Sequence, residues 1–327
     1  MSCVLIFGDI NVDLLARLPA PLATGTDNLF PAFELQLGGV GANAAVLLCK
    51  LGVEARVMSC VARDWLGDFA MQALESQSVN VSCITRVDGV TGLVVIPIDP
   101  GGQRTILGSR GANERAPSAD IATSLRGVDA VHVFGYMLLS EPTRRIVRDL
   151  IRRARTAGIL VSFDAGPGPS RQAREEILAL APELDVLFVS LEDAEALTGR
   201  SGAEAIEAIA RCGAREIVLK RGEAGCQFRQ GGRWWMVPPL AVEVVDTTGA
   251  GDAFAAGFLY AELRGWSSTD AALLANAMGA AAAAVLGAGA AMPGLAEVTR
   301  VLERDPADTS AHLLKLLRAE KSSAKVG

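Results

Sequence analysis

The stretch VVDTTGAGDAFAAGFLYAEL, from Val244 to Leu263, decides how the 327-residue sequence is interpreted. A short apolar run is followed by a glycine-rich turn and then by the spacing of an amphipathic helix. Gly249 and Gly251 lack a Cβ atom, so the backbone can turn tightly there and approach a ligand closely. The unpaired N–H groups and positive dipole end of the following helix favour phosphate. The stretch therefore predicts an anion cradle at Gly249, Ala250 and Gly251.

Asp252 lies in the first turn of that helix, beside the predicted cradle. A carboxylate in this position can accept the proton of a hydroxyl group that attacks a bound phosphoryl group. An ordinary pKa of about 4 is sufficient, because the proton can leave late in a loose transition state. The alternative is an acidic residue at a helix start after a plain turn. The first interpretation predicts phosphoryl transfer with Asp252 as the base.

Short apolar runs alternate with amphipathic segments along the rest of the chain. Such runs suit strands that are buried on both faces, and the segments between them suit helices. The alternation predicts an α/β fold with three α/β/α layers, in which helices cover both faces of a mainly parallel, Rossmann-like sheet. The runs are residues 4–8, 130–135, 160–164, 186–190 and 216–220, and the helical patterns are residues 143–157, 173–180 and 203–212.

Three segments in the first third have a different character, at about residues 12–18, 29–37 and 92–107. Their alternating pattern, and the turn at Asp99-Pro100-Gly101-Gly102, predict a small antiparallel sheet. The segments are interspersed with the α/β elements, so we expect a lid that projects from one domain of residues 1–304. Residues 305–327 are predicted to form a polar, peripheral tail with a short amphipathic piece at 312–317.

Composition excludes several functions. A formal charge of −6 argues against nucleic acid as a partner, and two histidines cannot build a histidine-rich metal site. Six scattered cysteines and the absence of a leader at Met1 predict a cytoplasmic protein without disulfides. Residues 271–296 carry no charge, but their Ala and Gly content favours a buried helix over a membrane span.

Two separated motifs resemble those of the ribokinase family, also called the PfkB carbohydrate kinases. The family's D-T-T-G-A-G-D signature is intact at Asp246 to Asp252, and a second signature, Gly-Gly-x-Gly-Ala-Asn, occupies Gly38 to Asn43. The resemblance extends from about residue 4 to residue 302. It implies a ribokinase-like fold and an ATP-dependent kinase that phosphorylates a sugar hydroxyl, with Asp252 as the base.

The resemblance implies that Asn11, Asp13, Gly39 and Asn43 hold the sugar hydroxyls. Amide and carboxylate groups suit paired hydroxyls, although a helix cap and a surface acid remain the alternative. The motifs are closest to those of ribokinases, with Val40 in place of the usual Lys and a second Gly-Ala-Asn at 111–113. Ribose-like pentoses or ketohexoses are therefore favoured. A nucleoside or a 2-keto-3-deoxy sugar acid is the alternative substrate.

For the nucleotide, the resemblance implies contacts from Lys220, Gly222, Gly225, Asn276 and Ser190. A hairpin turn at 220–225 and a buried polar Asn276 are the plainer interpretations. The family's magnesium motif N-x-x-E is replaced by Ser190-Leu191-Glu192-Asp193, which leaves Asp193 as the expected Mg²⁺ carboxylate.

Many relatives also hold a potassium ion beside the cradle. The resemblance places it at Asp246, Thr248 and the loop at 283–287, with Ala291 where some relatives supply a hydroxyl.

Other enzyme classes are not supported by motifs. No G-x-G-x-x-G follows the first strand, and neither G-x-x-x-x-G-K-[ST] nor G-x-S-x-G occurs. A regulator that binds a sugar or nucleoside without turnover remains the alternative of another class. The exposed edges of the lid strands predict a homodimer that forms through the lid.

Overall fold

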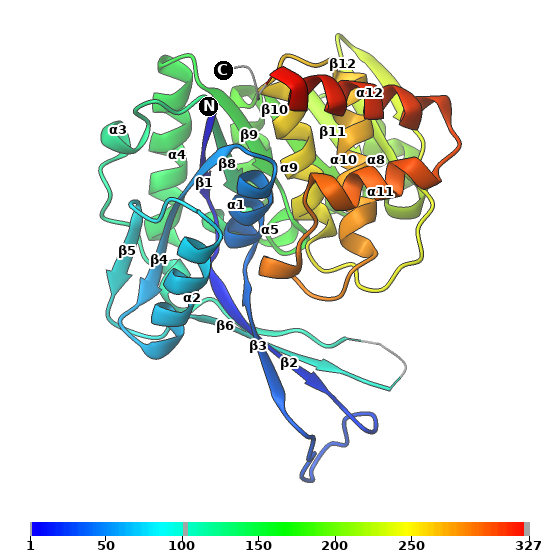
Figure 1. The fold of residues 1–327 in the computed structure, drawn as a ribbon. Coiled ribbons are helices and arrows are strands. Elements are labelled where there is room, and N and C mark those ends of the chain that lie inside the picture. Colours follow the sequence, from blue (N-terminus) through cyan, green and yellow to red (C-terminus); the bar gives the residue numbers. More distant parts are fainter. Residues whose placement is uncertain (1, 101–103, 324–327) are drawn as a thin grey trace.

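The computed structural model describes residues 2–100 and 104–323 (Figure 1). Within these ranges, nine strands form one large sheet in the order β13-β12-β11-β10-β9-β8-β1-β4-β5. Its strands are β1 (Cys3–Phe7), β4 (Glu54–Ala62), β5 (Ile84–Val87), β8 (Ala130–Phe134), β9 (Leu160–Asp164), β10 (Val186–Ser190), β11 (Glu216–Lys220), β12 (Cys226–Gln230) and β13 (Arg233–Val237).

The sheet is parallel from β5 to β11, and β12 and β13 continue it as an antiparallel hairpin. The five strands predicted from apolar runs are confirmed as β1, β8, β9, β10 and β11. The strands β4, β5, β12 and β13 were not predicted, because polar residues interrupt them near the sheet edges. After β1 the chain adds β4 on one side and β8 on the other, which creates a switch point between β1 and β8.

Helices cover both faces of this sheet. One face carries α1 (Val40–Lys50), α2 (Trp65–Ser76), α9 (Ala250–Glu262), α10 (Ser268–Ala283), α11 (Leu295–Arg304) and α12 (Asp308–Ser323). The other carries α3 (Ile121–Ser124), α4 (Glu141–Thr156), α5 (Pro167–Gln172), α6 (Arg174–Leu180), α7 (Leu191–Thr198) and α8 (Gly202–Ile209). In β1, Val4 and Ile6 point into the first core and Leu5 and Phe7 into the second, which confirms the three-layer prediction.

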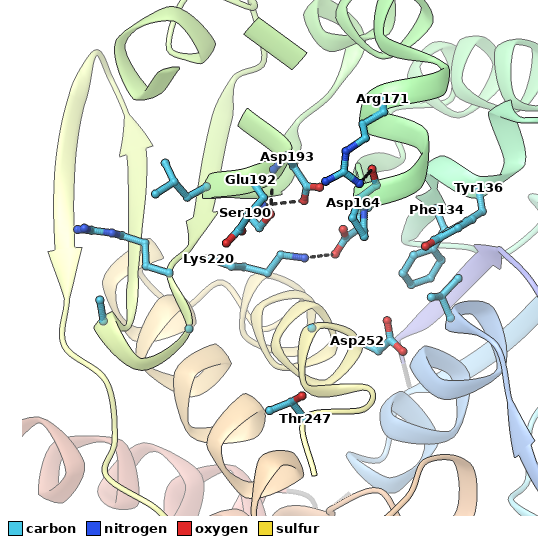
Figure 2. A pocket seen from close by; sticks show the side chains of 18 of the residues that line it. Phe134, Tyr136, Asp164, Arg171, Ser190, Glu192, Asp193, Lys220, Thr247 and Asp252 are labelled. Carbon is cyan, nitrogen blue, oxygen red and sulfur yellow. Dashed lines mark hydrogen bonds and ion pairs between the residues drawn. The ribbon is translucent and has the colours of Figure 1, made fainter. Parts of the chain in front are cut away.

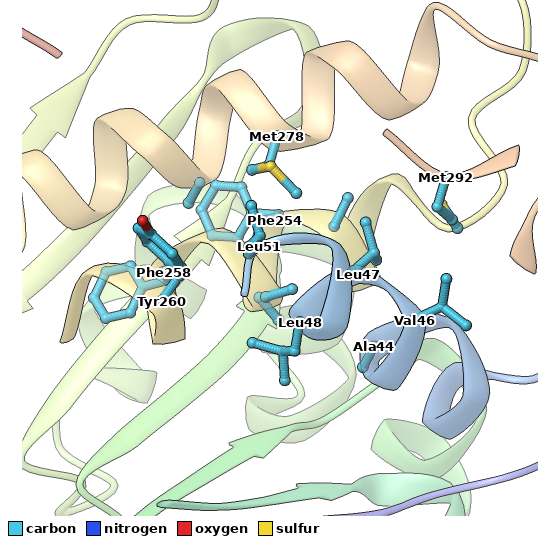
Figure 3. Packing of buried hydrophobic residues seen from close by; sticks show 14 of the residues in the cluster. Ala44, Val46, Leu47, Leu48, Leu51, Phe254, Phe258, Tyr260, Met278 and Met292 are labelled. Carbon is cyan, nitrogen blue, oxygen red and sulfur yellow. The ribbon is translucent and has the colours of Figure 1, made fainter. Parts of the chain in front are cut away.

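The packing of α1, α9 and α10 fixes the helix that begins at the glycine turn. Leu47 and Leu48 of α1 pack near Phe254 of α9, and Met278 lies on α10 above them (Figure 3). Gly257 permits the close approach of α9 to α10, because a Cβ atom there would lie 2.7 Å from Met278 Cγ. The start of α9 is therefore anchored on a rigid core.

A small sheet projects from the carboxyl edge of the large one (Figure 1). It contains β3 (Phe33–Gly38), β2 (Asn11–Arg17), β6 (Gly92–Ile98) and β7 (Leu107–Ser109), in that order. The predicted small sheet is confirmed, with antiparallel outer pairs and a parallel central pair of β2 and β6. Residues 101–103, which include part of the predicted turn and belong to the lid segment 92–107, lie outside the described residues.

The C-terminal segment differs from its prediction. Residues Asp308–Ser323 form α12, which is longer than the amphipathic piece predicted at 312–317. Leu313 and Leu317, one helical turn apart, are buried in the same core as Val298 and Leu302 of α11. The predicted amphipathic piece at 312–317 therefore lies within this helix, and the peripheral tail stays a prediction; residues 324–327 lie outside the described part. The domain limit at residue 304 stays a prediction.

The uncharged stretch 271–296 is mostly the buried helix α10 and the turns after it. None of the helices in the described residues combines the length and the apolar character that crossing a membrane requires.

Candidate active site

The carboxyl ends of the parallel strands meet at one edge of the sheet. Phe134, Asp164, Ser190 and Lys220 are the last residues of β8, β9, β10 and β11. Doubly wound sheets bind ligands at this edge. A cavity of about 840 Å³ opens here (Figure 2). It is lined by Val40, Phe134, Tyr136, Asp164, Gly166, Pro167, Arg171, Ser190, Leu191, Glu192, Asp193, Lys220, Arg221, Gly222, Glu223, Ala224, Thr247, Gly251 and Asp252.

The predicted cradle forms the N-terminal end of α9. Gly249 precedes the helix in the left-handed conformation, with φ of 72°, which glycine adopts without strain. The N–H of Ala250 donates to Thr247 O at 3.2 Å, so it is used inside the turn. Gly251 and Asp252 occupy the first turn, where a helix leaves its N–H groups without an intrahelical acceptor. Both line the cavity, whereas Gly249 and Ala250 do not.

Asp252 is buried at the cavity wall and contacts the second predicted motif. Its Oδ2 accepts a hydrogen bond of 2.9 Å from Asn43 Nδ2, and Asn43 Oδ1 accepts one of 3.2 Å from the N–H of Gly289. The pKa of Asp252 is raised to about 7, chiefly by burial and also by Asp164 and Asp13, against the lowering effects of Asn43 and Lys220. The mechanism requires only an ordinary pKa of about 4, and the sequence does not reveal this burial among other acids.

Lys220 provides a positive charge above the cradle. Its Nζ donates to Asp164 Oδ2 at 2.6 Å, and Figure 2 shows this pair facing the part of the cavity that contains Asp252. Burial opposes the charge, but Asp164, with Asp193 and Asp252, keeps the pKa of Lys220 above its ordinary value. A Cβ atom on Gly251 would lie 3.7 Å from Lys220 Nζ, so the ammonium group stands close to the open amides.

Sequence reasoning missed Asp164, together with Tyr136 and Arg171 on the cavity wall. Asp164 could have been predicted from the sequence, because it is an acidic residue at the carboxyl end of a buried parallel strand, which is the edge where ligands bind. Tyr136 lies in a 3-10 helix after β8 and Arg171 in the short helix α5 after β9, and no spacing in the sequence indicates them.

The residues expected to hold the sugar gather on the other side of Asp252, where β2 and α1 begin. Asp13 Oδ1 is buried and has no hydrogen-bond partner among the described residues, and burial raises the pKa of this carboxyl to about 7. Asn11 Oδ1 accepts a hydrogen bond of 2.9 Å from Asn113 Nδ2. Gly39 has φ of 91°, and a Cβ atom there would lie 2.5 Å from Asp9 O. These three residues and Asn43 do not line the large cavity.

The residues expected near the nucleotide separate into two groups. Gly222 and Ser190 line the cavity with Lys220. Gly225 and Asn276 do not: a Cβ atom on Gly225 would lie 2.3 Å from Val237 O, and Asn276 Nδ2 donates to Pro238 O at 2.8 Å. Gly225 thus leaves room for the segment at the end of β13, and Asn276 holds this segment by a hydrogen bond.

Ser190 and Asp193 form a capping box at the start of α7. Ser190 Oγ accepts from the N–H of Asp193 at 3.0 Å, and Asp193 Oδ2 accepts from the N–H of Ser190 at 2.8 Å. Asp193 Oδ1 accepts from Ser170 Oγ at 3.3 Å. Glu192 lines the same cavity, is exposed, and makes no hydrogen bond or ion pair within the described ranges. These ranges also contain no cluster of three or more metal-ligating side chains.

The two residues expected beside a potassium ion contact a cationic side chain. Asp246 accepts hydrogen bonds from the N–H of Thr248 at 2.7 Å and of Gly287 at 3.0 Å. The Arg104 guanidinium, carried by the small sheet, contacts Asp246 Oδ1 and Thr248 Oγ1. Burial opposes ionisation of Asp246, but these donors and Arg104 hold its pKa below the ordinary value.

Comparison with known proteins gives one consistent result. A model described as pfkB family carbohydrate kinase matches residues 1–294. An ATP-dependent ribose-1-phosphate kinase of Halopiger xanaduensis is 31% identical over 298 residues, which are 88% of this chain and 94% of the relative.

Solved structures agree with this comparison. An Arabidopsis thaliana ribokinase complexed with ribose and ATP is 25% identical, with a TM-score of 0.79, covering 93% of this chain and all of that one. A putative ribokinase II from E. coli is 24% identical and matches with TM-scores of 0.82 in its apo form and 0.81 with ATP and Mg²⁺; both comparisons cover 93% of this chain and all of that one.

Proposed function

We propose that this chain, which belongs to the pfkB family of carbohydrate kinases, transfers the γ-phosphoryl group of ATP to a hydroxyl group of a ribose-like pentose or a ketohexose. The observation that carries the proposal is the hydrogen bond between Asn43 and Asp252. It joins the predicted sugar residues to the helix start that borders the large cavity. A hydroxyl bound beside Asn43 would therefore lie next to both a carboxylate and a phosphate site.

The proposed roles follow from the charges at this junction. The N–H groups of Gly251 and Asp252 and the ammonium group of Lys220 would stabilise charge on the transferring phosphoryl oxygens. Asp252 would take the proton of the attacking hydroxyl, and its carboxyl is a better base when its pKa is near 7 than when it is near 4. Asp13 Oδ1, which is buried without a partner, would accept a hydrogen bond from a second sugar hydroxyl.

Mg²⁺ fits the cavity through few protein ligands. Mg²⁺ usually keeps several waters and binds one or two carboxylates together with substrate phosphates. Both oxygens of Asp193 already accept hydrogen bonds, so we propose that Glu192 and Asp193 hold the hydrated ion together. When bound, the ion would neutralise charge on the phosphate oxygens.

The other proposed properties concern the whole protein. The small sheet exposes Phe33, Leu35 and Leu107, which favours pairing of two copies through it. Chromatography with light scattering tests this point, and a monomer at working concentration would contradict it. The six cysteines are all free, which is consistent with a cytoplasmic protein.

The experiment is an ADP-formation assay with MgATP. The panel contains ribose, ribose 1-phosphate, fructose, a nucleoside and a 2-keto-3-deoxy sugar acid, with calorimetric binding measured in parallel. Turnover of ribose or a ketohexose supports the proposal, and preferred turnover of the nucleoside or the keto-deoxy acid supports the alternative substrates. Binding of a sugar without turnover of any compound would instead favour a non-catalytic regulator.

A further inference from the structure

Asp246 joins two loops that meet beside the glycine turn. Its Oδ1 accepts from the N–H of Thr248, and its Oδ2 accepts from the N–H of Gly287 in the loop after α10. The N–H groups of Val245 and Asp246 both donate to Ala283 O, at 2.8 and 3.1 Å. The side chain is 3% exposed, so its negative charge needs a partner inside the protein.

Arg104 is that partner. Its Nη1 contacts Asp246 Oδ1 and Thr248 Oγ1, and its Nη2 donates to Thr247 Oγ1 at 3.1 Å. The guanidinium therefore contacts three consecutive residues of the turn that leads into the cradle. Arg104 lies between β6 and β7 of the small sheet and forms an isolated bridge with Ile98, the last residue of β6. One cationic side chain thus links the small sheet to the start of α9.

A potassium ion does not fit this arrangement. The resemblance places such an ion at Asp246 and Thr248, but the guanidinium nitrogen already contacts the oxygens of both side chains. A second cation would be repelled by Arg104 and would lack these ligands. Ala291, where some relatives supply a hydroxyl, offers no further side-chain oxygen.

We propose that Arg104 is a built-in counter-ion that replaces a monovalent cation and positions the residues 246–248 that precede the cradle. This inference rests on the proposed kinase function and adds to it that the reaction needs no K⁺. Arg104 is a positioning residue, because it acts on the phosphoryl site through Thr247 and Thr248 rather than by contact with the reacting atoms.

The first test compares K⁺, Na⁺ and a bulky organic cation at equal ionic strength. Wild-type turnover should change less than twofold between them, whereas activation of several-fold by K⁺ would overturn the proposal. Arg104→Ala should lower kcat at least tenfold, and added K⁺ or guanidinium should recover much of the loss. Arg17→Ala, which removes an exposed arginine paired with Glu34 on the same small sheet, is the matched control and should behave like wild type.

Three outcomes count against the proposal. Unchanged kcat in Arg104→Ala would exclude a positioning role, and a rise in sugar KM alone would identify Arg104 as a substrate contact. A folded variant that neither cation rescues would exclude the counter-ion role. Arg104→Lys, which keeps the charge, should retain more activity than Arg104→Ala if the charge is what matters.

A substrate-free measurement separates this inference from the proposed kinase activity. K⁺ should raise the melting temperature of Arg104→Ala by several degrees and leave that of wild type unchanged. If no compound in the panel is phosphorylated, the kinase proposal fails while this melting experiment still decides the role of Arg104. Equal K⁺ effects on both proteins would contradict the inference.

Discussion

Asn43 of α1 and Asp252 of α9 are separated by 209 positions and joined by one hydrogen bond of 2.9 Å. Asn43 comes from the first signature and Asp252 from the second, so the two motifs form one junction. The same bond orients the carboxyl group, because Asn43 is itself fixed through the N–H of Gly289.

The two glycines of the turn should respond differently to alanine. Gly249→Ala places a methyl group 1.8 Å from Met292 Cε at φ of 72°, so the melting temperature should fall by several degrees. Gly251→Ala has room for its Cβ atom and lies in a helix, where alanine is favoured by about 1 kcal/mol.

The stability of Gly251→Ala should therefore be unchanged or higher, while turnover falls at least tenfold because the methyl group faces Lys220 Nζ. Thermal melts and kinetic assays of both variants test this. Wild-type turnover in Gly251→Ala would show that the open amides do not bind the phosphoryl group.

The pH dependence of kcat/KM should show a limb near neutral pH. The base must be unprotonated, so activity should be lost as the pH falls through about 7, the raised pKa of Asp252. Asp13 also has a pKa of about 7. The limb should persist in Asp13→Asn if it belongs to Asp252. A limb near pH 4 in wild type would mean that the carboxyl is not buried as described.

Glu216 should make stability depend on pH without affecting catalysis. It is 2% exposed, its Oε1 has no partner among the described residues, and burial, with Glu262 nearby, raises its pKa to about 7. Because this pKa is raised on folding, the stability it contributes is complete below about pH 4.5 and is lost as the pH rises through 7.

Glu216→Gln should therefore stabilise the protein by up to about 3 kcal/mol at pH 8 and by little at pH 5. Denaturant melts at both values test this, with the exposed Glu75→Gln as the control. An equal change at both pH values would contradict the assignment.

Glu192 is an exposed acid on the cavity wall, and we expect it to contact the hydrated Mg²⁺ ion. Glu192→Gln removes a carboxylate that is free to face a hydrated ion, so the Mg²⁺ concentration for half-maximal activity should rise several-fold. The melting temperature should stay the same because the side chain is exposed. Glu204→Gln, an exposed residue of α8, is the control. An unchanged Mg²⁺ requirement would leave Asp193 as the relevant acid.

The sequence predicted the elements with strong local patterns. Apolar runs identified β1 and β8 to β11, and the glycine turn identified the start of α9, because burial on both faces and backbone freedom act locally. The pKa of Asp252 could not be predicted, since it depends on burial and on Asn43 and Asp164, which are distant in the chain. The capping box between Ser190 and Asp193 was visible as a spacing, but Ser190 was assigned to the nucleotide and Asp193 to the metal instead. Arg104 had no local signal at all.

The most direct test of the central claim is single-turnover transfer from γ-labelled ATP to the best acceptor of the panel by Asp252→Asn. The variant keeps the shape of the side chain but cannot accept a proton, so binding of both substrates should stay within a few-fold of wild type. Transfer should fall by about 10²- to 10⁴-fold, the usual contribution of a positioned base. Transfer at the wild-type rate, with both substrates bound, would contradict the role of Asp252 and with it the proposed active site.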